Sequence, residues 1–134
     1  MNKLDNVISP NVEMTIKQIN KMTISELINK AKKSETINFS EVLNAIDSAF
    51  EFTPAKFKNG AIINEANSNN GSCKLFSFAK LHHLDVTETL FLFGEHYQKV
   101  LQTPNEEDHQ NIRNFMKFGW EGIHFEANAL SEKK

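Results

Sequence analysis

The chain has 134 residues, of which 40% are apolar and 24% charged, a composition that is typical of one folded domain and excludes a disordered polypeptide. Its formal net charge of −2 gives no basic excess for neutralising phosphates, so we expect no nucleic-acid partner. The longest apolar run, Leu90 to Phe93, is far too short to cross a bilayer, so we expect no membrane partner.

The first helix signal follows residues 1–22, whose weak periodicity predicts a loosely ordered N-terminal extension; residues 23–130 are expected to form one globular domain. Thr23-Ile24-Ser25-Glu26 is a capping box, in which the Thr and Glu side chains satisfy free amides at a helix start. A second helix is expected from Asn38, and its apolar stripe runs to Phe50.

A β-hairpin is predicted next. Asn59-Gly60 lies between two short segments, Ala55–Lys58 and Ala61–Asn64. An Asn-Gly pair is a strong hairpin signal because a type I′ turn needs positive φ at both central positions. A further short strand is expected from Ile123 to Ala127.

Three more helices are expected between these segments. The third begins at Asn69-Asn70-Gly71-Ser72 and ends near His82-His83, the fourth extends from Asp85 to Leu101 with Leu101 facing inward, and the fifth begins at Thr103-Pro104. The expected fold is mainly α, in the α+β class, with about five packed helices and one short β-hairpin. Its expected core contains Phe50, Phe76, Phe93, Ile112, Phe115 and Met116.

Cys73 lies in the first turn of the third predicted helix. Free amides and the helix dipole favour an anion at such a position, so we expect a lowered thiol pKa and a candidate catalytic nucleophile. The alternative is a small buried apolar residue, as most free cysteines are. As the chain's single cysteine it excludes an internal disulfide, which favours a cytoplasmic location.

Two histidines, His96 and His109, are expected on the shoulders of apolar stripes. On the fifth predicted helix, His109 begins a line that continues through Arg113 and Met116 to Trp120. Polar groups at the edge of a buried face need partners, and either histidine is a candidate general base for Cys73.

The candidate binding residues are polar or aromatic side chains near these positions: Glu65, Asn70, Asp108, Arg113 and Trp120. A guanidinium beside an indole suits an anionic group, whereas the alternative is a hydrogen-bonded network that only stabilises the fold. Glu65, His96 and His109, with Cys73 as a further ligand, are also of the types that bind zinc or iron. No spacing in the sequence identifies the metal or any other cofactor.

Several fragments of the chain, over residues 24–127, resemble the HopJ type III effector family. They occur in the family's order. The first group is Phe52-Thr53-Pro54, Phe57-x-Asn59-Gly60, Asn64-Glu65-Ala66 and Asn70-x-Ser72-Cys73-Lys74-Leu75-Phe76; the second is Thr89-Leu90, Phe93-Gly94, His96-Tyr97, Asp108-His109-x-Asn111-Ile112-Arg113, Phe115-Met116 and Gly119-Trp120-x-Gly122-Ile123-x-Phe125. The resemblance implies association with virulence and delivery through a type III secretion system, and it implies no defined activity.

Three hypotheses for the function follow. In the first, a HopJ-like domain acts by binding a host or bacterial protein or a small ligand. In the second, Cys73 is the nucleophile of a hydrolase or transferase with His96 or His109 as base. In the third, Glu65 and the two histidines bind a metal. The sequence does not define the oligomeric state.

Overall fold

The computed structural model describes residues 22–133, so the predicted extension over residues 1–22 lies, except for Met22, outside the described residues. Within residues 22–133 there are six α-helices, one 3₁₀-helix and five short strands. In chain order these are α2 (Ile24–Lys32), α3 (Phe39–Ala49), β1 (Phe50–Phe52), β2 (Phe57–Asn59), β3 (Ile62–Asn64), α4 (Asn70–Leu81), α5 (Val86–Phe91), α6 (Glu95–Gln102), α7 (Gln110–Phe118), η1 (Gly119–Gly122), β4 (Ile123–Phe125) and β5 (Leu130–Glu132).

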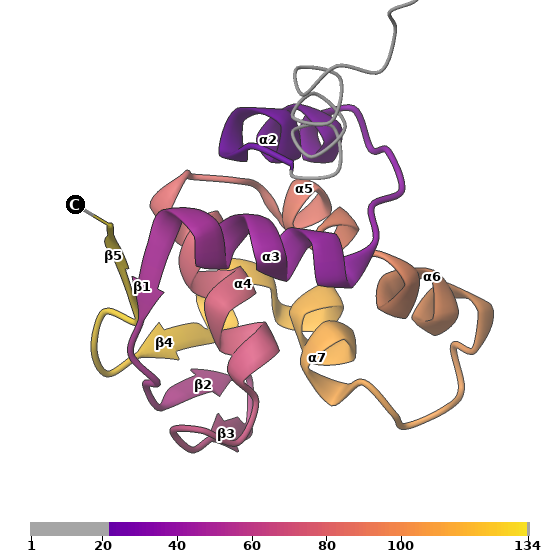
Figure 1. The fold of residues 1–134 in the computed structure, drawn as a ribbon. Coiled ribbons are helices and arrows are strands. Elements are labelled where there is room, and N and C mark those ends of the chain that lie inside the picture. Colours follow the sequence, from indigo (N-terminus) through magenta and orange to yellow (C-terminus); the bar gives the residue numbers. More distant parts are fainter. Residues whose placement is uncertain (1–21, 134) are drawn as a thin grey trace, which may run out of the picture.

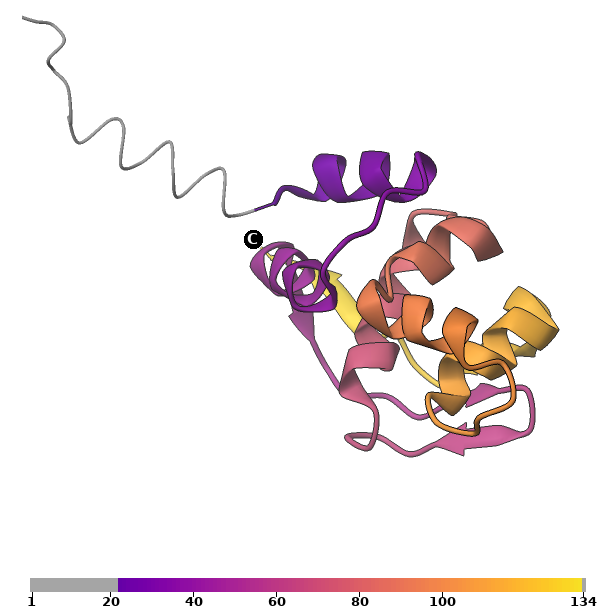
Figure 2. The same cartoon turned by 90° about the vertical axis from the view of Figure 1, so that its right-hand side faces the viewer.

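Helix α4 passes through the middle of the molecule and packs against α3 and α5 (Figure 1). A three-stranded sheet with the order β3-β2-β4 lies near the start of α4, and α7 packs against β2. A second, two-stranded sheet joins β1 to β5. The view turned by 90° shows α6 and α7 together beside the three-stranded sheet (Figure 2). The mainly helical α+β fold predicted from the sequence is therefore confirmed.

Three helix starts are capped as the sequence predicts. Thr23 and Asp85 each form a capping box with a glutamate three residues later. At the start of α3, the Asn38 side chain accepts a hydrogen bond from the Ser40 amide at 2.9 Å. Such caps satisfy amides that have no partner within the helix and typically stabilise it by about 1 kcal/mol.

The predicted fourth helix is two helices, α5 and α6, and the reason is Gly94. Gly94 lies between the end of α5 at Phe91 and the start of α6 at Glu95, and its φ of +59° does not fit a continuous right-handed helix. A Cβ atom at this position would lie 2.1 Å from the carbonyl oxygen of Ile37, so only glycine fits against the chain before α3. Because the helix is interrupted here, Leu101 does not continue the buried stripe, and 47% of its surface is exposed.

The fifth predicted helix begins at Gln110 and not at Thr103. His109 has φ +52° and ψ +49°, and a left-handed residue cannot continue a right-handed helix toward the N-terminus. Residues 103–109 form a loop that is tied to α7 by the Arg113 side chain, which donates to the Thr103 carbonyl at 2.8 Å.

The predicted hairpin is present, but its turn lies one residue later than expected. Asn59 pairs with Ile62, so the two turn residues are Gly60 and Ala61. Gly60 has φ +62° and Ala61 is not among the residues with positive φ. This combination fits a type II′ turn, because a type I′ turn needs positive φ at both central positions. The strand expected near the C-terminus also forms, and β4 pairs antiparallel with β2.

The core is rich in phenylalanine, as expected. Phe76 is fully buried and contacts Phe57, Phe93 and Phe115 through edge-on or tilted ring packing. Of the six core residues expected from the sequence, Met116 is wrong because it is 42% exposed. It follows Phe115, which fills the core side of α7, and the next residue of a helix points about 100° away.

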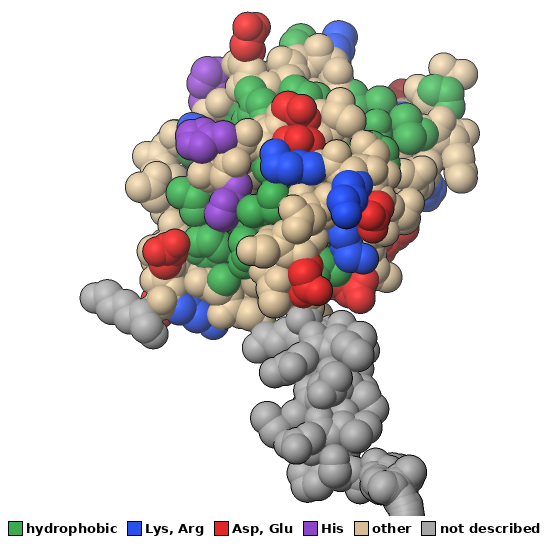
Figure 3. Space-filling model, turned by 90° about the horizontal axis from the view of Figure 1, so that it is seen from above, with side chains coloured by type: hydrophobic (Ala, Val, Ile, Leu, Met, Phe, Trp, Pro, Cys, Tyr) green, Lys and Arg blue, Asp and Glu red, His purple; other side chains and the backbone are tan. Residues whose placement is uncertain are grey.

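The surface carries charges of both signs. On the face shown in Figure 3, Lys and Arg side chains lie among Asp and Glu side chains, with apolar groups between them. Among residues 22–133 no helix has the length and apolar character needed to cross a membrane.

Candidate functional site

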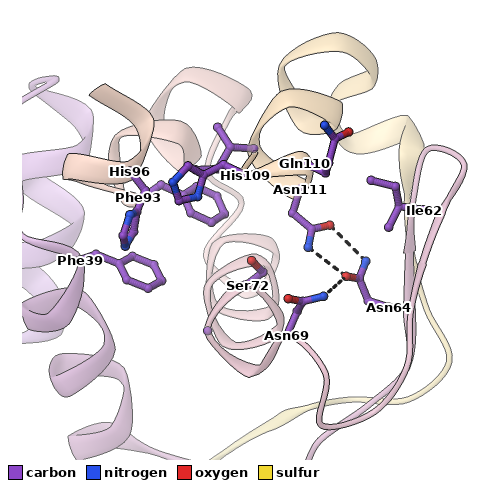
Figure 4. A pocket seen from close by; sticks show the side chains of 12 residues that line it. Phe39, Ile62, Asn64, Asn69, Ser72, Phe93, His96, His109, Gln110 and Asn111 are labelled. Atoms are coloured by element: carbon purple, nitrogen blue, oxygen red, sulfur yellow. Dashed lines mark hydrogen bonds between the residues drawn. The ribbon is translucent and has the colours of Figure 1, made fainter. Parts of the chain in front are cut away.

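A cleft with a volume of about 450 Å³ opens between the starts of α4 and α7, and we call it the α4–α7 cleft (Figure 4). Strand β3 and the first residues of α3 and α6 complete its walls. The residues that line it are Phe39, Ile62, Asn64, Asn69, Gly71, Ser72, Phe93, His96, His109, Gln110, Asn111 and Ile112.

Two imidazole rings face each other on one wall of this cleft. The centroids of the His96 and His109 rings are 5.0 Å apart, at an angle of 39°. His96 also contacts the ring of Phe39 edge-on at 4.9 Å. The turn before His96 is fixed to α3, because the Glu95 carboxylate accepts a hydrogen bond from the Phe39 amide at 2.8 Å. This hydrogen bond lowers the pKa of Glu95.

The loop before α7 holds His109. Arg113 donates to the Asp108 carbonyl at 2.5 Å and to the Asp108 carboxylate at 2.7 Å. The carboxylate also forms an ion pair with Lys99 at 3.3 Å. These contacts, with the hydrogen bond from Arg113 foremost, lower the pKa of Asp108. His109 Nε2 lies 3.9 Å from Asp108 Oδ2, further than either cation, and the His109 ring lines the cleft beside His96.

Asn59, Asn64, Asn69 and Asn111 form a chain of hydrogen-bonded asparagines, which we call the amide cluster; the last three line the opposite wall of the cleft, and Asn59 lies buried behind them. Asn64 and Asn111 exchange two hydrogen bonds: Asn111 Nδ2 donates to Asn64 Oδ1 at 2.9 Å, and Asn64 Nδ2 donates to Asn111 Oδ1 at 3.1 Å. Asn69 Nδ2 donates to Asn64 Oδ1 at 2.6 Å, and Asn59 Nδ2 donates to Asn111 Oδ1 at 3.0 Å. The cluster joins β2, β3, α4 and α7.

Two helices begin at the cleft, and neither start has a side-chain cap. Asn69 precedes α4 and His109 precedes α7, and neither side chain accepts a hydrogen bond from its helix. The Ser72 side chain lies in the first turn of α4, across the cleft from the histidines (Figure 4). The first amides of an α-helix have no partner within it, and they carry the positive end of the helix dipole.

Of the catalytic residues proposed from the sequence, the structure brings two together in the cleft, His96 and His109. Cys73 follows Ser72 but does not line the cleft. It is 2% exposed, and its thiol contacts the Ala55 carbonyl at 3.5 Å. Burial raises its pKa, which is opposite to the direction expected from its place at a helix start. Desolvation of the thiolate therefore outweighs the helix dipole at this position.

The proposed binding residues are dispersed. Glu65 is exposed and 3.9 Å from Lys56, outside the cleft. Asn70 is the first residue of α4, and its Nδ2 lies 3.4 Å from Asn67 Oδ1. Arg113 is turned toward the 103–109 loop. Trp120 belongs to η1 and packs on Phe76 and Phe115, while its Nε1 donates to the Leu84 carbonyl at 2.9 Å.

The helical line from His109 to Trp120 is consequently not formed, because His109 precedes α7 and Trp120 follows it. The proposed metal set is also separated. Among residues 22–133 no group of three or more His, Cys, Asp or Glu side chains is placed to hold a metal ion.

The sequence does not single out the amide cluster or Phe39 as parts of a site. Asparagines near glycine are typical of turns, so their pattern predicts loops and not a binding wall. One signal was available. Phe57 and Asn64 are paired across the hairpin and Asn64 is 1% exposed. Alternation along a strand places Asn59 on the same side as Phe57, so a polar residue recurs on the side that faces the core.

Comparisons with known proteins identify the family. The family model described as "HopJ type III effector protein" matches residues 24–130. A solved structure, described as that of the unknown function protein VPA0580, is 47% identical, with a TM-score of 0.81, over 84% of this chain and 96% of that one. No match is found among curated proteins. The resemblance noted in the sequence is thus confirmed, and the chain belongs to the HopJ type III effector family.

Proposed function

We propose that this domain acts by binding a small ligand in the α4–α7 cleft. The observation that carries the proposal is the pair of imidazoles, His96 and His109, 5.0 Å apart on the wall of an open cavity of about 450 Å³. Ligand pockets are commonly about 300–1,000 Å³ and combine apolar walls with a few placed polar groups. This cleft has both kinds of wall.

The polar wall is fixed before any ligand arrives, which supports the proposal. Each oxygen of Asn64 and Asn111 accepts two hydrogen bonds within the amide cluster. The apolar wall is equally constrained, because Phe93 and Ile112 are 2% and 3% exposed. Binding to such a preformed site requires little ordering of side chains, so more of the interaction free energy is available as affinity.

The geometry gives less support to the two chemical hypotheses. Cys73 is buried outside the cleft with a raised pKa, so a thiolate is disfavoured there. For the metal hypothesis, only two side chains of the lining, His96 and His109, are of the Cys, His, Asp and Glu types.

The test is a fragment screen by ligand-observed NMR on the full chain, with a variant that fills the cleft. Ser72→Phe places a ring at the start of α4 inside the cavity, and Ser25→Phe, on the exposed surface of α2, is the matched control. We expect fragments that bind the wild type and Ser25→Phe and fail to bind Ser72→Phe. If no fragment binds, or if Ser72→Phe binds the same fragments, the proposal is wrong.

A protein partner is the second candidate, and an exposed apolar groove favours it. Leu101 and Met116 are 47% and 42% exposed, and together with Val100 and Pro104 they line a groove of about 310 Å³. In a pull-down experiment, a protein that docks in this groove should be captured by the immobilised wild type and by Ser72→Phe, and it should not be captured by Leu101→Glu. If Leu101→Glu retains the same proteins as the wild type, the groove is not a docking site.

Delivery of this chain through a type III system, after synthesis in the bacterial cytoplasm, is part of the proposal. Its support is the family description, which names type III effectors. An adenylate cyclase reporter fused to the chain should raise cyclic AMP in host cells only when the bacterium has an intact secretion system. An equal signal from a secretion-deficient strain would contradict delivery by this route.

A further inference from the structure

We infer that the ligand of the α4–α7 cleft carries a compact anionic group, a carboxylate or a phosphate, which is held between His96 and His109. The inference rests on the proposed function and names the chemical class of the ligand.

The lining of the cleft carries no permanently charged side chain. None of the twelve residues that line the cleft is Asp, Glu, Lys or Arg, and its ionisable side chains are the two histidines. Histidine is the side chain whose charge ordinarily changes between about pH 5 and 8. The side chains of the lining can therefore add positive charge to the cleft and cannot add negative charge.

The amide cluster uses the carboxamide acceptors of Asn64 and Asn111 on the polar wall of the cleft. A carboxamide oxygen has two lone pairs, and both are used on Asn64 and on Asn111 by donors of the amide cluster. Asn69, at the exposed edge, keeps an oxygen that accepts no hydrogen bond from the cluster, and Gln110, whose Nε2 donates to the Glu107 carbonyl, adds a second carboxamide oxygen to the lining. The Ser72 hydroxyl and the imidazole N–H groups remain as donors toward the centre of the cleft, and the uncapped starts of α4 and α7 add partial positive charge.

The carboxylates nearest the two histidines already have partners. Asp108 is bound by Arg113 at 2.7 Å and by Lys99 at 3.3 Å, both closer than the 3.9 Å between its Oδ2 and His109 Nε2. Glu95, adjacent to His96, accepts the hydrogen bond from the Phe39 amide. Two imidazoles whose centroids are 5.0 Å apart repel each other when both are protonated. An anion between them removes that repulsion and gains a charge-assisted hydrogen bond from each ring.

The apolar side of the cleft indicates the rest of the ligand. Phe39 and Phe93 stack with ring centroids 6.0 Å apart beside His96, and Ile62 lies on the opposite wall. An anionic group attached to a planar or apolar body matches this arrangement, since the ring faces exclude water from the charged contact.

The test measures the affinity of four small probes for the full chain by NMR. Benzoate and phenyl phosphate are anionic, benzamide is neutral and benzylamine is cationic, and all four are similar in size. At pH 6 we expect the two anions to bind in the cleft about tenfold or more tightly than benzamide, with benzylamine weakest.

The double variant His96→Gln, His109→Asn removes both imidazoles while keeping the backbone, because Asn tolerates the left-handed conformation of residue 109. It should weaken benzoate binding by about tenfold and leave benzamide unchanged. His124→Gln on β4, exposed and outside the cleft, is the control and should change neither probe.

The outcomes separate the inference from the proposed function. If benzamide or benzylamine binds in the cleft as tightly as benzoate, or if the double variant leaves benzoate affinity unchanged, the inference is overturned and the proposed function survives. If neither these probes nor any library fragment binds in the cleft, both are overturned.

Discussion

Replacing Asn64 with Asp tests whether the amide cluster holds the wall of the cleft. Asn64 is 1% exposed, its Nδ2 donates to Asn111 Oδ1 at 3.1 Å, and its Oδ1 accepts from Asn69 and Asn111. An ionised carboxylate keeps the acceptor and replaces the donor with a second oxygen that faces Asn111 Oδ1. Losing the hydrogen bond costs about 1 kcal/mol, and burying an acceptor without a donor costs about 1–3 kcal/mol more.

We therefore expect Asn64→Asp to lower the free energy of unfolding by about 2–4 kcal/mol at pH 7, measured by urea titration with circular dichroism. The cost should shrink at pH 4, because a protonated carboxyl again has an O–H donor for Asn111 Oδ1 beside its acceptor oxygen. Asn105→Asp, in the exposed 103–109 loop, is the matched control and should cost less than about 0.5 kcal/mol. A loss below about 0.5 kcal/mol for Asn64→Asp, or an equal loss at both pH values, would refute this account of the cluster.

Four further predictions concern stability and reactivity. Phe93→Ala should lower the free energy of unfolding by about 3–5 kcal/mol because Phe93 is 2% exposed, whereas Met116→Ala should cost less than about 1 kcal/mol; equal losses would contradict the observed core. Arg113→Ala should cost about 1–3 kcal/mol, because it leaves the Thr103 carbonyl and the Asp108 carboxylate without their donor; a thermal melt like that of the wild type would contradict this role. Burial lowers the pKa of His82 in the folded state. Its contribution to stability is therefore complete above the unfolded-state pKa of about 6.5 and is lost as the pH falls below that value, because the unfolded chain then binds the proton more readily. His82→Gln should accordingly reduce the difference in unfolding free energy between pH 8 and pH 5. Iodoacetamide should leave Cys73 unmodified in the native protein at pH 7 and label it in urea, and rapid labelling of the native thiol would show that burial does not control it.

The fold was predictable to the extent that local sequence determines it. Capping residues such as Thr23 and Asp85 act over a few residues, and each begins a helix as expected. The predicted hairpin also forms, with its turn one residue later than Asn59-Gly60. The errors arise where tertiary contacts dominate. Gly94 divides a helix because its Cα packs against the carbonyl of Ile37, which is distant in sequence. Arg113 keeps residues 103–109 in a loop by hydrogen bonds that no local pattern contains.

The candidate site was predictable only in part for the same reason. His96 and His109 could be selected as polar residues beside apolar stripes, and the structure brings their rings together. The amide cluster could not be assembled, because its four asparagines come from β2, from β3 and from the starts of α4 and α7. Cys73 illustrates the opposite case: its local position favours a thiolate, and burial under the Ala55 carbonyl reverses that preference.

The most direct test of the proposed function is an amide chemical-shift map of the ¹⁵N-labelled full chain during titration with any fragment from the screen. The two helix starts that face the cleft are 40 residues apart in sequence, with Gly71 and Ser72 on α4 and Asn111 and Ile112 on α7. We predict that the amides of both starts shift together with one dissociation constant. Shifts confined to the groove around Leu101, or to one helix start alone, would contradict a ligand site in the α4–α7 cleft.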